Sequence, residues 1–238
     1  MSASAPQSRT PREIGTVFVT GGASGLGAAV VEAVQEAGGT PAVLDRAAPQ
    51  ADAAHVRVDL ADSAAALEAV EELAGRVGPP SAVVTAAGTD AVGELLSVEH
   101  EAWERVVRVN LFGTVAVVRA CLPHLEKVNG SVVTVASTLA LKGADAATAY
   151  AASKFGIRGF TQSLAVEYAG RVGVTCLLPG GMDTAFFDDR EERFKPAPDQ
   201  ELNDPANTAA TVLTALRQPV GCEIREMLVM ASGEPSWP

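Results

Sequence analysis

The chain has 238 residues, of which 47% are hydrophobic and 20% are charged, so it can bury the core of one large α/β domain. Its formal net charge of -11 argues against a nucleic-acid-binding protein, because phosphates are bound by an excess of Lys and Arg. The same acidity argues against binding to an anionic membrane surface. No run approaches the roughly 18 consecutive apolar residues of a membrane span.

The first part of the chain and the cysteines favour a cytoplasmic protein. Residues 1–13 are polar, include two prolines and lack the apolar core of a signal peptide, so we expect a flexible tail. The three cysteines, Cys121, Cys176 and Cys222, have no metal-like spacing, and we expect free thiols in a reducing compartment. No metal is expected.

Strand and helix signals alternate through residues 14–238. The first strand, 14–20, is followed by a glycine-rich turn and a helix over 28–37. Further strands are expected at 41–45, 55–59, 81–86, 131–136, 172–178 and 227–230, and helices at 63–77 (with Ser63 as N-cap), within 98–125, at 148–168 and at 205–216. Several strands are apolar throughout, which is typical of a parallel sheet covered on both faces. The sequence predicts a single α/β domain with a doubly wound sheet of about seven strands.

The glycine-rich turn, residues 21–27, lies between the first strand and the first helix. There Gly21 permits a tight turn, Gly25 lets the backbone approach a pyrophosphate, and Gly27 lets helix and sheet pack closely. The free N–H groups and the dipole at the start of the helix favour phosphate. A turn without a ligand is the alternative, and the strand-to-helix context favours a dinucleotide-binding loop instead.

The second strand ends on Asp45, 24 positions after Gly21 (45 minus 21). A carboxylate there can accept hydrogen bonds from both adenosine ribose hydroxyls and repels a 2′-phosphate, which favours NAD over NADP. Arg46 has the opposite tendency, because a guanidinium can bind that phosphate. A surface ion pair between these two neighbours explains Arg46 at least as well.

Tyr150 and Lys154 occupy positions i and i+4 of the helix predicted over 148–168, so their side chains share one face. A nearby cation lowers the pKa of a phenol, which is about 10 in a model peptide, and makes tyrosine usable as a general acid or base. The same spacing also occurs on ordinary helix surfaces. The interpretation therefore depends on what else in the chain converges on this pair.

The Gly-x-x-x-Gly-x-Gly pattern of residues 21–27, with the later Tyr-x-x-x-Lys pair, resembles the short-chain dehydrogenase/reductase family over roughly residues 14–230. The resemblance implies a single-domain Rossmann fold, a nicotinamide cofactor and a homo-oligomer, either a dimer or a homotetramer. The implied catalytic residues are Asn110, Ser137, Tyr150 and Lys154. The implied cofactor-binding residues are Gly21, Ser24, Gly25, Leu26, Gly27, Asp45, Arg46, Asp59, Leu60, Ala87, Gly88, Tyr150, Lys154, Pro179, Gly180, Met182 and Thr184.

The resemblance also implies a role for each catalytic residue. Tyr150 would give a proton to a ketone oxygen while the nicotinamide gives a hydride to the carbon. Lys154 would keep the pKa of the tyrosine low and bind the nicotinamide ribose, and Ser137 would donate to the carbonyl oxygen. Asn110 would anchor a water that links Lys154 to solvent. The segment from Pro179 would close over the nicotinamide carboxamide.

Two departures from the family pattern stand out. Thr85-Ala86-Ala87-Gly88 replaces the common Asn-Asn-Ala-Gly, so side chains that tie this strand to its neighbours are lost. Residues 231–238 replace a glycine-rich finish, and we expect them to shape either a subunit contact or a pocket edge.

A polar, proline-containing segment, residues 182–203, is the expected substrate loop. Its Phe186 and Phe187 are either an apolar lid over a substrate or pins that hold the loop to the core. With Leu139 and Asp90 beside the loop, we expect a partly apolar pocket for a small alcohol or ketone.

The leading hypothesis is an NAD(P)(H)-dependent oxidoreductase that interconverts a secondary alcohol and a ketone, with NAD(H) preferred and NADP(H) less favoured. An NADPH-dependent 3-oxoacyl thioester reductase is the main rival, and Asp45 argues against it. A non-catalytic dinucleotide-sensing regulator on the same fold is expected to have lost Tyr150 or Lys154, and both are present. A sugar-nucleotide epimerase usually needs a larger substrate domain. Nucleic acid and membrane are not expected partners.

Overall fold

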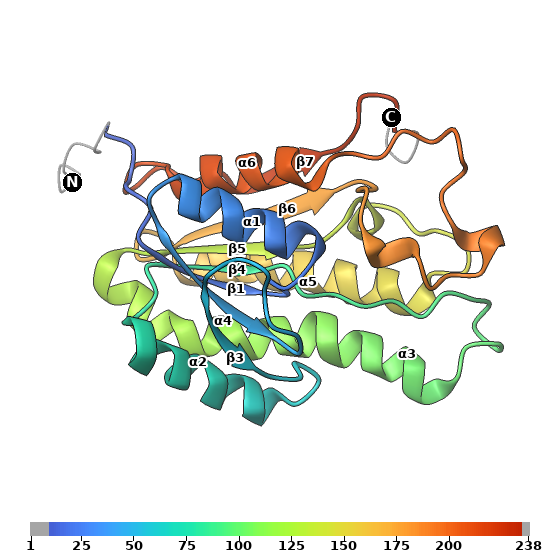
Figure 1. Cartoon of the computed structure of the whole chain (residues 1–238), viewed down its shortest axis with the longest axis horizontal. Helices are drawn as coiled ribbons and strands as arrows, with labels where there is room; N and C mark the ends of the chain where they lie inside the picture. Colours follow the sequence, from blue (N-terminus) through green and yellow to red (C-terminus); the bar gives the residue numbers. More distant parts are fainter. Residues whose placement is uncertain (1–9, 235–238) are drawn as a thin grey trace.

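A single parallel sheet organises the computed structural model, which describes residues 10–234 (Figure 1). Its strands are β1 (Thr16–Thr20), β2 (Thr40–Asp45), β3 (Ala54–Arg57), β4 (Ala82–Thr85), β5 (Ser131–Val135), β6 (Gly173–Pro179) and β7 (Glu226–Val229). They lie in the order β3-β2-β1-β4-β5-β6-β7. The order reverses between β1 and β4, and a crevice opens at such a switch point beyond the carboxyl ends of the strands. The predicted doubly wound α/β fold is confirmed.

Helices cover both faces of this sheet. They are α1 (Gly25–Glu36), α2 (Ser63–Val77), α3 (His100–Val107), α4 (Thr114–Leu125), α5 (Thr148–Glu167) and α6 (Pro205–Leu216). In Figure 1, α1 and α6 lie above the sheet, whereas α2 and α4 lie below it. Alternate strand residues face opposite layers, so Val17 and Val19 pack with α1 and α6 while Phe18 packs with α2 and α4. This explains why the strands are apolar throughout.

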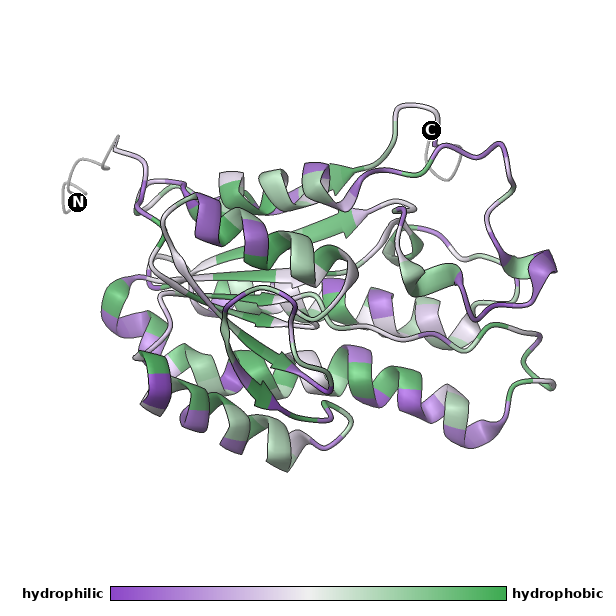
Figure 2. Cartoon of the chain, viewed as in Figure 1, coloured by the Kyte–Doolittle hydropathy of each residue, from purple (hydrophilic) through white to green (hydrophobic). Residues whose placement is uncertain are grey.

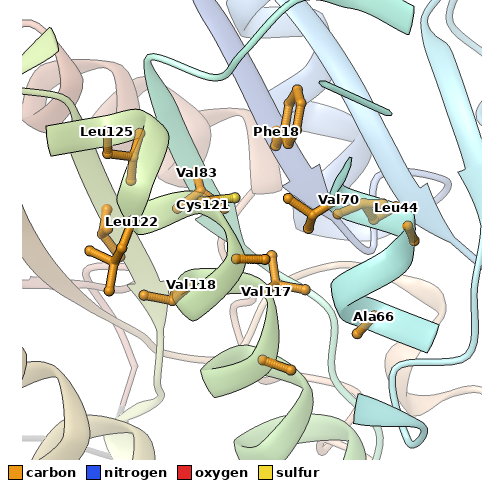
Figure 3. Close-up of a cluster of buried hydrophobic side chains, with 14 of the residues drawn as sticks. Phe18, Leu44, Ala66, Val70, Val83, Val117, Val118, Cys121, Leu122 and Leu125 are labelled. Atoms are coloured by element: carbon orange, nitrogen blue, oxygen red, sulfur yellow. The ribbon is translucent and has the colours of Figure 1, made fainter. Parts of the chain in front are cut away.

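The layer beneath the sheet is the larger of the two cores. Figure 3 shows Phe18 and Leu44 from the strands facing Val70 of α2 and Val117 of α4. Each of these side chains is fully buried. Burying a side chain of this size stabilises the fold by about 1.5–3 kcal/mol, so the sheet is a rigid base for the loops at its carboxyl edge.

A continuous helical run, His100–Val128, joins α3 to α4 and is long and apolar enough to span a membrane by length and composition alone. This run is not visible in the sequence as consecutive apolar residues, because charged side chains interrupt it. Figure 2 shows hydrophilic and hydrophobic residues interleaved along α3. The apolar side of α4, including Val117, Val118 and Cys121, is buried against the sheet and α2. The run is a core helix of this domain.

Two helix starts differ from the sequence prediction. Asp62, not Ser63, is the N-cap of α2, because its carboxylate accepts from the N–H groups of Ala64 and Ala65 at 3.0 and 3.1 Å. Helix α1 begins at Gly25, three residues before the predicted start, so the last glycines of the turn belong to its first turn.

Of the tail predicted at 1–13, residues 1–9 lie outside the described part of the chain. Arg12, in the described part, is hydrogen-bonded to the rest of the domain. Its N–H donates to the Arg217 carbonyl at 3.1 Å, and its guanidinium donates to Ser131 Oγ and the Val128 carbonyl, both at 3.4 Å. These bonds fix the chain before β1 to the edge opposite the crevice.

Candidate active site

The glycine turn forms a cradle of backbone atoms at the carboxyl end of β1. Gly21 and Gly25 have φ values of 71° and 51°, which glycine adopts without strain. A Cβ on Gly27 would lie 2.0 Å from the Gly21 carbonyl oxygen, so only glycine fits there. Ser24 precedes α1 without a side-chain cap bond, which leaves N–H groups at the start of the helix for a ligand. This arrangement fits a pyrophosphate.

Asp45 joins the end of β2 to this cradle. Its Oδ2 accepts from the Ala23 N–H and its Oδ1 from the Ala47 N–H, both at 3.0 Å. A carboxylate has about four lone-pair sites, so each oxygen retains one for a further donor. Arg46 beside it is exposed. The geometry leaves room for the predicted ribose contact.

Asp59 and Leu60 lie after β3, at the same edge. Asp59 accepts from the Ala61 N–H at 3.0 Å and from Arg105 at 2.8 Å. Partial burial acts to raise the pKa of Asp59, but these hydrogen bonds and the Arg105 charge outweigh it and hold the pKa below its usual value. Leu60 packs on Gly113, where an added Cβ would lie 2.8 Å from it. Arg105 was not expected at this position.

The turn after β4 remains tied to its neighbour despite the missing asparagines. Thr20 Oγ1 accepts from the Ala87 N–H at 3.1 Å, a tie that the sequence did not predict. Thr85 Oγ1 is buried, and it lacks a partner among the described residues. A Cβ on Gly88 would lie 3.7 Å from Asn110 Oδ1 and 3.8 Å from Lys154 Nζ, so this turn borders the catalytic set.

A π-helical turn, Arg108–Gly113, carries Asn110 into the interior. The Asn110 amide donates to the Thr89 carbonyl at 2.9 Å and to Ser153 Oγ at 3.0 Å, and its Oδ1 accepts from the Thr89 N–H at 2.8 Å. Both donors are therefore used within the protein, and Oδ1 keeps one lone pair for the predicted water. The side chain fixes the β4 loop to α5 next to Lys154.

The structure brings Ser137, Tyr150 and Lys154 together. Ser137 follows β5, its hydroxyl lies close enough to the Tyr150 phenol to act on its pKa, and its Oγ accepts from the Leu139 N–H at 3.1 Å. Lys154 Nζ donates to the Val135 carbonyl at 2.8 Å and lies 5.3 Å from the centroid of the Tyr150 ring. The predicted juxtaposition of the two α5 side chains is present, with β5 supplying the partners.

The structure contradicts the predicted effect of Lys154 on the pKa of Tyr150. Burial and the nearby Asp90 carboxylate raise the pKa of Tyr150, and they outweigh the Ser137 hydrogen bond and the Arg190 charge. Burial lowers the pKa of Lys154 to about 8. The prediction was wrong because it considered only the neighbouring charge and omitted the cost of burying either ion. Tyr150 therefore keeps its proton at neutral pH.

A salt bridge that the sequence did not predict holds the substrate loop over Tyr150. Arg190 Nη2 lies 2.8 Å from Asp90 Oδ2, and the two side chains are only 19% and 9% exposed. The guanidinium lies 5.1 Å from the Phe186 ring centroid and 4.6 Å from that of Phe187. The Phe186 and Tyr150 ring centroids are 5.7 Å apart. We call Asp90, Arg190 and these two phenylalanines the latch.

Beyond the latch lies a cavity of about 250 Å³ between residues 91–102 and 191–194. Val98, Ala102 and Phe194 give it a partly apolar lining, but Leu139 and Asp90, which were expected to line the substrate pocket, are not part of it. Glu191 and Arg193 lie at its rim and form an exposed ion pair of 2.9 Å.

The segment from Pro179 to Thr184 connects β6 with the substrate loop. Met182 forms a strand-like bridge with Asn203 at the far end of that loop. A Cβ on Gly25 would lie 3.5 Å from the Thr184 methyl group, so the segment reaches the glycine cradle. The predicted cofactor-binding residues of β1, β2, β4 and β6 thus border one crevice.

Sequence comparison places the chain in a known family. The family model described as short chain dehydrogenase matches residues 15–194. The chain belongs to the short chain dehydrogenase family. It is 36% identical over 182 residues to 2-dehydro-3-deoxy-L-rhamnonate dehydrogenase (NAD(+)) of Sphingomonas sp. (strain SKA58), covering 72% of this chain and 73% of the relative. It is 31% identical over 192 residues to the 3-oxoacyl-acyl-carrier-protein reductase FabG of Thermotoga maritima, covering 75% of this chain and 78% of the relative.

A solved structure has the same fold. The alcohol dehydrogenase of the archaeon Thermococcus sibiricus, complexed with 5-hydroxy-NADP, superposes with a TM-score of 0.83 and 20% identity, covering 93% of this chain and 98% of the other. Family membership makes the protein an oxidoreductase of this class and supports a nicotinamide cofactor, NAD or NADP. The glycine cradle and the uncapped start of α1 fit such a cofactor.

Proposed function

We propose that the protein is an NAD-preferring oxidoreductase that interconverts a secondary alcohol and a ketone. The observation that carries the proposal is the Tyr150 phenol beside the Ser137 hydroxyl, with the buried Lys154 amine 5.3 Å from its ring centroid. This set lies at the carboxyl edge of the sheet, next to a cradle that fits a dinucleotide. A bound nicotinamide supplies the hydride, or accepts it in the reverse direction.

Tyr150 acts as the general acid in the reduction direction. Its raised pKa keeps the phenol protonated at neutral pH, so the proton is available to the ketone oxygen as negative charge develops there. Ser137 Oγ is held by the Leu139 N–H, which leaves the hydroxyl hydrogen free to be donated to the same oxygen.

Lys154 returns the proton to Tyr150. With a pKa of about 8, the buried amine exchanges protons near neutral pH, which an ordinary lysine does not. Its hydrogen bond to the Val135 carbonyl fixes the amine at the base of the site, behind Asn110 and Gly88. Oxidation of an alcohol uses these steps in reverse.

The catalytic role is tested by Tyr150→Phe, with Tyr168→Phe, at the opposite end of the same helix, as the matched control. We expect the first variant to lose about 10²-fold or more in turnover, while its dissociation constant for NADH stays within about twofold. The control should retain activity, because Tyr168 packs under Arg171 away from the site. Retention of most of the activity by Tyr150→Phe would refute the role of the phenol.

The preference for NAD rests on Asp45. A 2′-phosphate would meet this carboxylate, which the Ala23 and Ala47 N–H groups hold in place. We expect Asp45→Ala to weaken NADH binding and to relax the rejection of NADPH, as measured by fluorescence titration. A wild-type protein that already prefers NADPH would contradict the ribose argument.

An NADPH-dependent 3-oxoacyl thioester reductase is the second candidate, favoured by the likeness to the Thermotoga maritima reductase. The cavity of about 250 Å³ beyond the latch has room for part of an acyl chain. A panel of alcohols, ketones and 3-oxoacyl thioesters, followed by NADH or NADPH absorbance, separates the two candidates. The third reading, a regulator without turnover, predicts no activity with any of them.

We further propose a cytoplasmic homo-oligomer, a dimer or tetramer, that acts on a small molecule and needs neither nucleic acid nor membrane. Exposed apolar side chains on the turn before α4 and on α5, namely Phe112, Phe155 and Val166, support a contact between copies. Light scattering on Phe155→Glu should show smaller particles than wild type. A wild-type monomer would refute the oligomer.

A further inference from the structure

Glu234 is a buried carboxylate that the proposed chemistry does not use. It lies five residues after β7 and is 7% exposed. Its Oε2 accepts from the Gly181 N–H at 3.0 Å. Among residues 10–234, it has no salt-bridge partner within 4.0 Å. Burying a carboxylate costs free energy unless hydrogen bonds satisfy it. Because Glu234 is buried against the Gly181 N–H, it can hold Gly181 in position.

Two neighbouring glycines leave the space that Glu234 occupies. A Cβ on Gly180 would lie 2.7 Å from Met230 Cβ and 3.1 Å from Glu234 Oε2. On Gly181 it would lie 2.8 Å from Leu202 Cδ2 and 3.2 Å from the same oxygen. Neither glycine has a positive φ. Glycine is therefore required here by close approach and not by backbone conformation, and part of that approach is the carboxylate.

The segment is held from three directions. Glu234 binds the Gly181 N–H, while the Gly181 carbonyl accepts from the Asn203 N–H at 2.9 Å. The Gly180 N–H donates to the Val229 carbonyl at 2.8 Å. Three residues after Gly181, the Thr184 methyl group faces the glycine cradle at Gly25. A shift of Gly181 would therefore move the wall of the cofactor crevice.

We propose that Glu234 is a positioning residue, which sets the Pro179–Thr184 segment through Gly181 so that it can receive the nicotinamide end of the cofactor. The inference rests on the proposed function in that it takes this crevice as the cofactor site. The last described residues of the chain then belong to the pocket edge, one of the two roles expected for residues 231–238. Residues 235–238 lie outside the described part.

The experiment separates the nicotinamide end of the ligand from its other end. Calorimetry gives dissociation constants for NADH and for ADP-ribose, which lacks the nicotinamide. Glu234→Ala should weaken NADH about tenfold and ADP-ribose less than about twofold. Glu234→Gln keeps an acceptor oxygen for the Gly181 N–H and should stay within about threefold of wild type. A chain ending at Glu234 is the control and should bind both ligands like wild type.

Three outcomes would overturn the inference. These are unchanged NADH binding in Glu234→Ala, equal weakening of NADH and ADP-ribose, and a Glu234→Gln variant as weak as the alanine variant. The melting temperature of each variant shows whether it is folded. Failure of the proposed function would look different: wild type would turn over no alcohol or ketone, while the ratio of the two binding constants would still decide the role of Glu234.

Discussion

The two walls of the crevice are built by different means. The cofactor wall, residues 20–27 with Asp45, is fixed by backbone atoms that approach where side chains are missing: a Cβ on Gly21 would lie 2.7 Å from Ala87 Cα. The substrate wall, residues 179–203 with the latch and Glu234, is proposed to receive the nicotinamide end of the cofactor as well, and it is fixed by side chains that come from distant parts of the chain. Backbone contacts can form with many different side chains around them, whereas one substitution can remove a side-chain contact. Single substitutions should therefore alter the substrate wall more easily than the glycine cradle.

The largest effect is expected at the cofactor wall from Gly27→Ala. The added Cβ would lie 2.0 Å from the Gly21 carbonyl oxygen, so the cradle must deform. We expect NADH affinity to fall about 100-fold or more, or the protein to unfold, as followed by titration and thermal denaturation. Gly75→Ala is the control, because its Cβ on α2 meets nothing within 4 Å, and it should stabilise the protein by up to about 1 kcal/mol. Normal NADH binding by Gly27→Ala would refute a backbone-built cradle.

A smaller and more selective effect is expected at the substrate wall from Asp90→Asn and Arg190→Gln. Either change breaks the 2.8 Å salt bridge and frees the loop from Tyr150. We expect kcat/KM to fall about tenfold with NADH affinity nearly unchanged, and the double variant to lose little more than either single one. Arg193→Gln, which removes an exposed ion pair of the same loop, should have little effect. Additive losses would show that the two side chains act separately.

A third effect, on the free energy of unfolding and not on cofactor or substrate binding, concerns Lys154, which lies between the walls. Its folded-state pKa of about 8 is below the ordinary 10.5, so below pH 8 the folded protein bears the full cost of a buried charge. As the pH rises from 8 to 10.5 the folded state releases this proton before the unfolded state does, and stability rises by up to about 1.4 kcal/mol per pH unit.

Urea denaturation of wild type and Lys154→Met at pH 7 and pH 10 measures this difference. Wild type should gain stability relative to the variant at the higher pH. The exposed Lys127→Met should show no such change. If the difference between wild type and Lys154→Met is the same at both values, the amine is not buried as a charge.

The cofactor wall was predictable from the sequence because its signals are local. Gly21, Gly25 and Gly27 lie within seven residues, and their conformational and steric demands are those of the pattern itself. The parallel sheet with helices on both faces followed from the alternation of strands and helices and from the apolar runs. Local signals were less reliable at helix starts, where Asp62 replaced Ser63 as the cap.

The substrate wall was only partly predictable, because its contacts join distant residues. Asp90 and the phenylalanines were expected near the pocket, but Arg190 is 100 positions from Asp90, and Glu234 is 53 from Gly181. The predicted direction of the Tyr150 pKa shift was wrong for a related reason. Its direction is decided by burial under the loop, which no short motif records.

The π-helical turn at Arg108–Gly113 has a consequence for the evolution of the site. An α-helix advances about 100° per residue, and a π-turn takes up one residue more than a regular turn. Because the π-turn absorbs the extra residue, removing one residue there would restore a regular helix without rotating α3 against α4, and Val106 and Val117 could both stay buried. A single insertion is thus enough to turn the Asn110 amide inward, and a single deletion would cost the amide while leaving the packing of the helix intact.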